Sequence, residues 1–290
     1  MGVREMAGTP KDFGTIAAEF EERPFPEGAL LINAWSAETN RPLQFYDLNA
    51  KIHAAADAGH THIVLINVLG QRFICAGMEH KDVLVDIYGT PGNDLGVFMD
   101  GPTIEVFGNA EDQAGNTLNS GRIIIHGNAW DVTGLAARDG TILVKGNGGY
   151  RIGIHMKEYE DYRPVLVYGG AVKEFFGEYM AGGVLVALGM DLEDGKAEDL
   201  PAHKVVRSSL GSGIHGGAIY VRGDVPDHYL GVAASKQPFE DEDKATLKPI
   251  LEDFCSTFEV DIDRIWERDF TKVAPASSRP YGGYYNPRSV

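Results

Sequence analysis

Short runs rich in β-branched residues recur through the middle of the chain, with glycine-containing segments between them. In each run two aliphatic residues stand two positions apart. The pairs are Val83 and Val85, Ile104 and Val106, Ile123 and Ile125, Ile142 and Val144, Val165 and Val167, Val184 and Val186, and Ile219 and Val221. Alternation with a period of two is typical of strands that turn one face to a core. We therefore expect short strands with these pairs facing inward.

The glycines between the runs repeat every nineteen residues. One set is Gly70, Gly89, Gly108, Gly127 and Gly146, and a second set, seven positions later, is Gly77, Gly96, Gly115, Gly134 and Gly153. Corresponding corners of later units contain Gly177, Gly183, Gly211 and Gly217. Glycine permits positive φ and close approach of two backbones, so these positions are the predicted structural glycines of sharp corners.

A unit of this length cannot bury its apolar face alone, but stacked units form a continuous core and pair their backbones. A propeller blade needs about 40 residues, and the leucine-rich repeat pattern is missing. The predicted fold class is therefore mainly β, a right-handed parallel β-helix, or single-stranded β-solenoid, with rungs of about 19 residues. Two polar insertions break the period, one around Glu158 to Tyr162 and one from Met190 to Arg207. Both should bulge outward.

The flanking segments predict three domains: an N-terminal strand-helix-strand cap over 1–67, the β-helix over 68–235, and a helical and extended C-terminal tail over 236–290. In the cap, Asp47 or Asn49 is expected to begin a helix that runs to about Ala58. In the tail, a helix after Pro238 contains Pro249, which should kink or divide it.

The rest of the tail is expected to be extended, with a short helix from about 263 to 268 before it. Its last part is rich in tyrosine, from Tyr281 to Tyr285. Such a segment either wraps a partner or folds back on the solenoid, and we expect the folded ends to be covered by the cap and by the tail.

The formal net charge of −16 argues against nucleic acid or an anionic membrane as partner, because both need a basic surface. No apolar run is long enough for a membrane span. Cys75 and Cys255 lie far apart without metal-binding spacing, so we expect a reduced, cytoplasmic protein, in which Cys75 is a buried, inert thiol of the β-helix. The oligomeric state is open, and a homo-oligomer is possible.

Two patterns suggest ligand sites, and both have a simpler explanation. The glycine-rich stretch from Gly146 to Gly153 imitates a dinucleotide-binding loop, but no helix is expected after it and its end glycines belong to the repeat. His53, His60 and His62 could bind zinc if they converged, but no carboxylate completes the set. We therefore expect no cofactor and no metal.

Other polar residues also favour structural roles. His155 and His215 occupy what reads as the same slot beside a glycine corner. Asp191, Glu193 and Asp194 lack the spacing of a calcium loop. A carbohydrate-cleaving β-helix would need Asp, Arg or Lys gathered on one strand across successive rungs, and the strand ends show no such cluster. No catalytic residue is predicted.

The repeats and three segments carry a family resemblance. GEYMAGG at 177–183, GSGIHGGAIYV at 211–221 and GNAEDQAGNTLNSGRIIIH at 108–126 resemble the GXGXG domain at the C-terminus of the glutamate synthase large subunit. The resemblance covers about residues 30 to 235. The repeat-containing structural subunit of formylmethanofuran dehydrogenase has similar repeats, and GIHMK at 153–157 is similar to its rungs.

The resemblance implies a non-catalytic scaffold. In glutamate synthase the amide-cleaving cysteine, the FMN and the iron–sulfur cluster lie in other domains, which the β-helix braces. This chain is then expected to be a stand-alone β-helix subunit that organises glutaminase-like and FMN-binding partner subunits. The alternative is the corresponding structural subunit of a formylmethanofuran dehydrogenase or of a formyltransferase/hydrolase-type complex.

Overall fold

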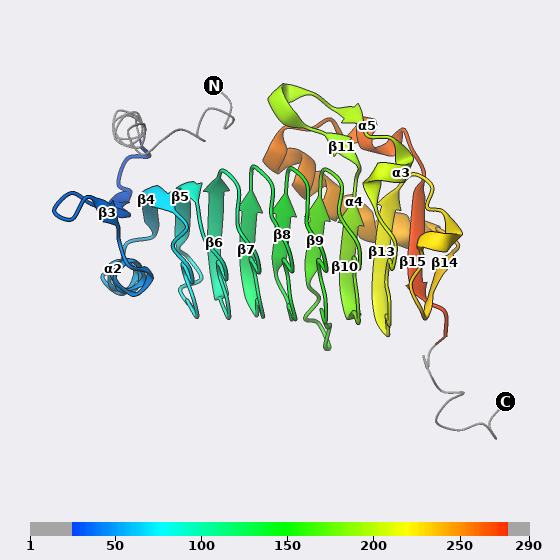
Figure 1. Cartoon of the computed structure of the whole chain (residues 1–290), viewed down its shortest axis with the longest axis horizontal. Helices are drawn as coiled ribbons and strands as arrows, with labels where there is room; N and C mark the ends of the chain where they lie inside the picture. Colours follow the sequence, from blue (N-terminus) through cyan, green and yellow to red (C-terminus); the bar gives the residue numbers. More distant parts are fainter. Residues whose placement is uncertain (1–24, 278–290) are drawn as a thin grey trace, which may run out of the picture.

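A computed structural model describes residues 25–277 as an elongated stack of strands (Figure 1). Eleven strands form one sheet. In spatial order they are β1 (Leu30–Asn33), β4 (His62–Leu69), β5 (Leu84–Thr90), β6 (Asp100–Phe107), β7 (Ser120–Ile125), β8 (Thr141–Val144), β9 (Val165–Tyr168), β10 (Ala181–Ala187), β13 (Gly216–Arg222), β15 (Phe270–Pro275) and β14 (Ala234–Gln237). Two small hairpins pair β2 (Trp35–Ser36) with β3 (Arg41–Pro42) and β11 (Met190–Asp191) with β12 (Glu198–Asp199).

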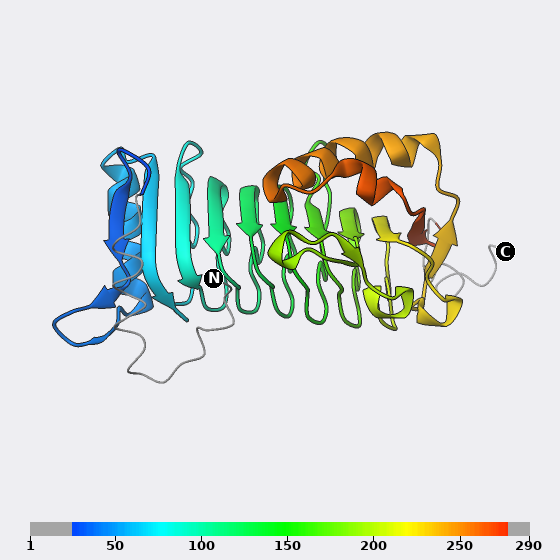
Figure 2. The same ribbon diagram turned by 90° about the horizontal axis from the view of Figure 1, so that it is seen from above.

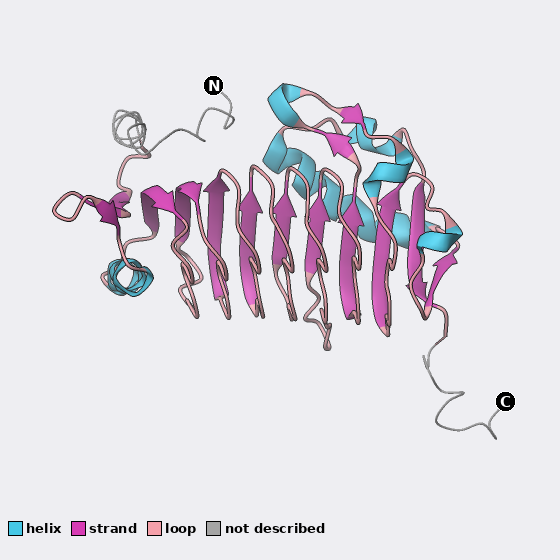
Figure 3. Cartoon of the chain, in the orientation of Figure 1, coloured by secondary structure: helices cyan, strands magenta, loops and turns pink. Residues whose placement is uncertain are grey.

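In the large sheet the strands β1, β4 to β10 and β13 pair parallel with their neighbours, and they build a β-solenoid of about 6 turns. This confirms the expected fold class. The described helices are α2 (Phe45–Asp57), α3 (Ala202–Val205), α4 (Asp241–Phe258) and α5 (Ile262–Trp266), with short 3-10 turns at Glu193–Gly195 and Asp227–Tyr229. Between β5 and β13 the lower corners of the solenoid in Figure 3 consist of loops.

The inner core contains alternate residues of every parallel strand. Ile123 and Ile125 face inward as expected, but in β9 and β10 the prediction was one residue out of register. The inward residues there are Leu166 with Tyr168 and Leu185 with Ala187. Val165, Val167, Val184 and Val186 instead belong to a second apolar cluster on the outer face. Both faces of these strands are buried, so alternation could not distinguish inside from outside.

The corners explain why glycine repeats at one position of each rung. A rung passes through three left-handed residues in close succession, for example Val132 (φ 63°), Gly134 (φ 70°) and Ala136 (φ 53°). A Cβ on Gly134 would lie 2.4 Å from a methyl group of Leu166 in the core. The outer two residues point their side chains away from the core and tolerate the strained φ, whereas the central one has no room for a side chain.

Asparagine side chains join successive rungs at the next corner. Asn109 Oδ1 accepts a hydrogen bond from the Asn128 backbone N–H at 2.8 Å, and Asn128 Oδ1 accepts from Asn147 at 2.7 Å. Asn147 Oδ1 continues the ladder to the Ala171 N–H at 2.9 Å. These bonds satisfy corner N–H groups that have no strand partner, which is why Gly-Asn recurs at the start of three units.

The helix α2 covers the N-terminal end of the inner core with Leu48 and Ile52. It begins at Phe45, before the predicted caps, with Gln44 at the N-cap. Asn49 therefore lies inside the helix, where its Oδ1 accepts a hydrogen bond from the Cys75 N–H at 2.9 Å and ties α2 to the first rung.

The C-terminal segment covers a side of the solenoid as well as its end. The helix α4 lies along the outer face of the sheet, as Figure 2 shows, and packs Leu247, Leu251 and Phe254 against outward residues of β7 to β13. Pro249 lies on its exposed side and does not divide it. The segment was expected to cover one end of the stack, and α4 covers part of its side in addition.

The described part of the tail folds back on the solenoid. The strand β15 pairs antiparallel with β13 and with β14, which extends the sheet beyond the last parallel strand. The tyrosine-rich stretch from Tyr281 to Tyr285 lies outside the described residues.

Candidate interaction surfaces

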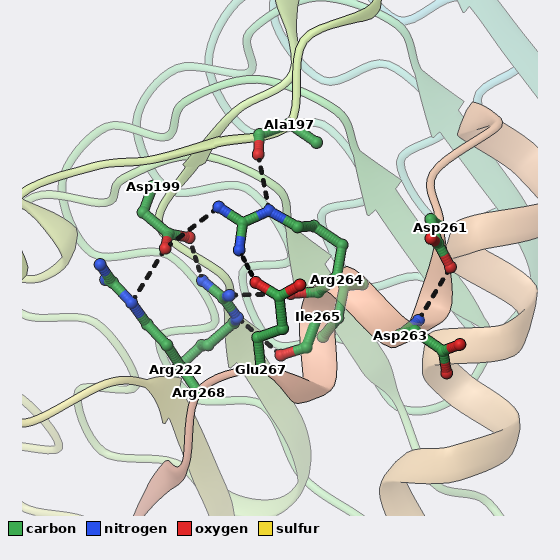
Figure 4. Close-up of polar contacts among 9 residues, drawn as sticks. All are labelled: Ala197, Asp199, Arg222, Asp261, Asp263, Arg264, Ile265, Glu267 and Arg268. Carbon is green, nitrogen blue, oxygen red and sulfur yellow. Dashed lines mark hydrogen bonds and ion pairs between the residues drawn. The ribbon is translucent and has the colours of Figure 1, made fainter.

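Three arginines converge on one carboxylate where the Met190–Arg207 insertion meets α5 (Figure 4). Arg222 has no exposed side-chain surface, and its Nη1 lies 2.6 Å from Asp199 Oδ1. Arg268 Nε and Arg264 Nη2 lie 3.0 and 3.3 Å from Asp199 Oδ2. Arg222 also donates to the carbonyl oxygens of Ile265 and Arg264 at 2.7 and 2.9 Å. This cluster fastens β12 and α5 to β13.

Electrostatics support a structural role for this cluster. Burial opposes the charge of Asp199, but the hydrogen bond from Arg222 and the charges of Arg222, Arg268 and Arg264 outweigh it and hold the pKa of Asp199 below its ordinary value. Both carboxylate oxygens of Asp199 pair with arginines, so its charge is balanced within the fold. The insertion is therefore a fixed part of the fold on this side.

Towards the N-terminal end, where α4 does not reach, Phe25 and Ala29 pack with Tyr88 against the outer face of β4. Here His62 Nε2 lies 2.8 Å from Asp86 Oδ2, and His126 Nε2 lies 2.6 Å from Glu105 Oε1. Asp86 and Glu105 are register partners in β5 and β6. Burial raises the pKa of Asp86 despite the opposing hydrogen bond and charge of His62.

A row of aromatic rings lies beside these ion pairs and leads to α4. Tyr88 stacks on Phe107 at 4.7 Å between ring centroids, and Phe107 stacks on His126 at 4.9 Å. His126 then meets the edge of Phe258 in α4 at 5.3 Å. Rigid aromatic groups of this kind are enriched in protein interfaces, and we name the region from Asp86 to His126 the N-terminal outer face.

A polar groove runs along the corners at which the strands begin, and Asp100 and Ser120, the first residues of β6 and β7, lie in its lining. Its floor contains side chains from consecutive rungs at the repeat distance of nineteen residues, namely Lys81, Asp100, Asn119, Arg138 and Lys157. Ser120, Asp139, Tyr159 and Tyr162 complete its lining. The volume is about 740 Å³. We call these nine residues the corner groove.

Sequence reasoning missed this groove because it searched the ends of the strands. The sequence does contain the signal, since the five floor residues share one repeat position. The sequence analysis considered only the strand ends, so the row of charged and polar residues at the corners was not examined. A polar side chain at a corner points to solvent from every rung, and stacking alone brings these side chains into a row.

Comparison with known proteins places the chain in a family. A model of the GXGXG motif family matches residues 48–276, which include every parallel strand from β4 to β13. The chain belongs to the GXGXG motif family. This is the family of the glutamate synthase C-terminal domain. The chain is also 51% identical over 252 residues to the Methanocaldococcus jannaschii protein MJ1350, a match that covers 85% of this chain and 95% of that one. MJ1350 is described only as an uncharacterized protein.

Most of the predicted structural glycines lie between the strands, but Gly89, Gly183 and Gly217 lie inside β5, β10 and β13. Gly77, Gly96, Gly115, Gly134, Gly153, Gly177 and Gly211 have φ between 62° and 74°. Gly89, Gly183 and Gly217 also have positive φ, and a Cβ on Gly89 would lie 2.1 Å from the carbonyl oxygen of Val68. Gly70 has φ 75°, while Gly108, Gly127 and Gly146 instead allow close approach of a neighbouring rung's backbone.

The predicted ligand patterns have structural roles in the GXGXG fold. Among residues 25–277, no three His, Cys, Asp or Glu side chains gather to hold a metal ion. His53 Nε2 instead lies 3.2 Å from the Ala76 carbonyl oxygen, and His62 is paired with Asp86. The stretch from Gly146 to Gly153 forms a solenoid corner with no helix after it.

The histidines expected at glycine corners occupy different positions in their rungs. His155 and His215 do not occupy equivalent positions in their rungs. The backbone N–H of His215 donates to the carbonyl oxygen of Met180 in the rung before it, and the N–H of Lys157 donates to that of Ala137 in the same way, so His215 is equivalent to Lys157. His155 stands two residues earlier in its rung. Within the described range, no helix is long and apolar enough to cross a membrane.

Both cysteines are buried and free. Burial raises the pKa of Cys75 to about 12, and burial together with the charge of Asp261 raises that of Cys255 to about 11. Neither thiol forms the thiolate that a nucleophile or a metal ligand needs near neutral pH.

Proposed function

We propose that this chain is a non-catalytic scaffold subunit of a glutamate synthase-like complex, in which it organises a glutaminase-like and an FMN-binding subunit for glutamate biosynthesis. The observation that carries the proposal is membership of the GXGXG family over the whole solenoid. In that family's glutamate synthase member the domain accompanies catalytic domains, and here the chain consists mainly of that domain.

The architecture supports such a role. Each strand from β4 to β10 is hydrogen-bonded on both sides, so the solenoid presents side chains at fixed intervals of about 4.8 Å along its length. The N-terminal outer face and the corner groove offer two surfaces, one with aromatic rings and one with polar side chains, for contacts with partners. Both cysteine thiols are free and buried, as expected for a protein in the reducing cytoplasm.

Affinity purification of the tagged full-length chain from its native cell tests the proposal. We expect a glutaminase-like and an FMN-containing subunit to co-purify in fixed ratio. The chain alone should release no ammonia from glutamine and bind no flavin. Recovery of neither subunit, or turnover by the chain alone, would contradict the proposal.

A truncation after Ser277 asks whether the tyrosine-rich end contributes. It leaves β15 intact, whereas a truncation from Phe270 would remove a sheet strand and confuse folding with binding. We expect the shorter chain to remain folded and to recover less of its partners.

A further inference from the structure

Two positions after the glycine of each turn, equivalent residues of successive rungs form a row along the solenoid. All have positive φ, between 52° and 71°, and the later part of the row consists of Ala136, His155, Tyr179, Gly213 and Ala233. The backbone N–H of each of the first four donates, at 2.6–3.0 Å, to the carbonyl oxygen of the residue before the next member. The row therefore advances by one residue per rung, and we call it the turn row.

The described chain ends beside the turn row. Ala276, which follows β15, donates its backbone N–H to the carbonyl oxygen of Ala233 at 2.8 Å. The neighbouring Val232 is 68% exposed. Residues 278–290 therefore begin at the C-terminal end of this row, within two residues of a fixed contact.

Aromatic rings lie along the turn row, in the direction that leads from this contact back over the solenoid. The ring of Tyr179 is 43% exposed and stacks on His155, with 5.3 Å between ring centroids. A Cβ on Gly213 would lie 2.5 Å from Tyr179 Cδ1, so this ring also reaches over the rung that follows it.

A second stacked pair stands four residues earlier in the same two rungs. The guanidinium carbon of Arg151 lies 4.6 Å from the centroid of the Phe175 ring, and the group is paired with Glu178. The ring of Tyr150 is 42% exposed. Tyrosine and arginine are enriched among the residues that contribute most to binding at protein interfaces. We call Tyr150, Arg151, His155, Phe175 and Tyr179 the aromatic face.

Charge does not select the occupant of the aromatic face. The cations Arg151, Lys173 and Arg207 are matched in number by the carboxylates Asp131, Glu174 and Glu178, which lie in the same or adjacent rungs. A highly charged ligand of either sign gains little from a balanced surface. The exposed rings favour an occupant with aromatic side chains.

The segment that follows the described residues has this composition. Residues 278–290 contain three tyrosines, two prolines and two arginines, and no acidic side chain. Their tether to Ala276 gives them a far higher effective concentration at the aromatic face than a separate molecule has.

The segment is also long enough to cover the face. His155 lies three rungs from Ala233 along the turn row, or about 14 Å at about 4.8 Å per rung. An extended chain rises about 3.3 Å per residue, so Tyr281, five residues after Ala276, can reach the rung of His155. Tyr284 and Tyr285 have reach to spare.

From the end point, the length and the composition we infer that residues 278–290 bind the aromatic face of their own chain. In this arrangement Tyr281, Tyr284 and Tyr285 pack against the rings of Tyr150, Phe175 and Tyr179. The inference goes beyond the scaffold proposal and does not depend on the identity of any partner subunit.

Timed digestion of the full-length chain with chymotrypsin, with the released C-terminal peptides followed by mass spectrometry, tests the inference. Cleavage after Tyr281, Tyr284 and Tyr285 should be slow in the wild type. The double variant Tyr150→Ala/Tyr179→Ala should release these peptides about tenfold faster, because two rings of the face are removed. The matched variant Tyr159→Ala/Tyr162→Ala removes two other exposed rings and should stay within about twofold of the wild type.

Three results would overturn the inference. The first is equal release from the wild type and Tyr150→Ala/Tyr179→Ala, and the second is equal acceleration in the matched variant. The third is protection that increases with protein concentration, which would place the segment on a second copy of the chain. Unchanged thermal melting verifies that the variants fold. If Tyr150→Ala/Tyr179→Ala melts early, Tyr179→Ala alone decides, with about threefold faster release expected.

Discussion

Adding one methyl group at Gly134 should separate two costs that glycine avoids at the solenoid corners. The matched position is Gly77, which has the same place in the repeat and φ 62°. A Cβ on Gly77 meets nothing within 4 Å, whereas a Cβ on Gly134 lies 2.4 Å from Leu166 Cδ2. Gly77→Ala therefore measures the backbone cost alone, and Gly134→Ala adds the steric clash.

The two costs have different magnitudes. A left-handed conformation costs a residue with a Cβ roughly 1–2 kcal/mol, and the reduced freedom of the unfolded chain returns about 0.4–1 kcal/mol. Gly77→Ala should thus lower the free energy of unfolding by about 1 kcal/mol. Leu166 is fully buried, so it cannot move aside freely, and overpacking adds about 1–3 kcal/mol. We expect Gly134→Ala to cost about 2–4 kcal/mol.

Denaturant unfolding of both variants, compared through midpoints and slopes, provides the measurement. Ala136→Gly is a further control, because Ala136 has positive φ but points outward, and its replacement should raise the free energy of unfolding by about 1 kcal/mol, the reverse of Gly77→Ala. If Gly134→Ala and Gly77→Ala cost the same, the second glycine of the repeat does not face the core and the explanation for the repeat is wrong.

Further predictions concern the anchoring cluster, the carboxylates, the thiols and the exposed hairpin. Asp199→Ala should cost about 3–5 kcal/mol in chemical denaturation because it leaves Arg222 buried without its counter-ion; a loss below 1 kcal/mol would show that the arginine is solvated. For Asp243, burial is outweighed by hydrogen bonds from Lys272, Tyr220 and a backbone N–H, so its pKa, like that of Asp199, is lowered. The stability from both groups should be complete above about pH 4 and be lost as the pH falls through their folded pKa values, so melting temperatures measured against pH should converge for wild type and Asp199→Asn in acid. Cys75 and Cys255 should resist a thiol reagent at pH 8 until the chain unfolds, and fast labelling of the native protein would contradict their burial. Limited proteolysis should cut first at 158–162, and a first cut inside a parallel strand would argue against the rung assignment.

Much of the solenoid could be predicted from the repeat, because each rung satisfies the same local constraints as its neighbours. Gly134 recurs as Gly115 and Gly153 because every rung brings the same corner against the same core. The strand positions, the polar insertion before β9 and the buried state of Cys75 follow from the same periodicity. The row of charges in the corner groove was also present in the repeat, although only the corner geometry shows that it lines one cavity.

Contacts between residues far apart in the chain were decided by the tertiary structure alone. The helix α4 buries Val167 and Val184 on the outer face. Both faces of β9 and β10 are therefore apolar, and the alternation of residues does not show which of them face the inner core. Asp199 meets Arg222 and Arg268 from separate segments that follow no period. A repeat determines how each unit packs on the next, because equivalent residues meet at every step. The place where a non-repeating segment docks depends on which apolar and charged surfaces remain uncovered once the whole solenoid has formed.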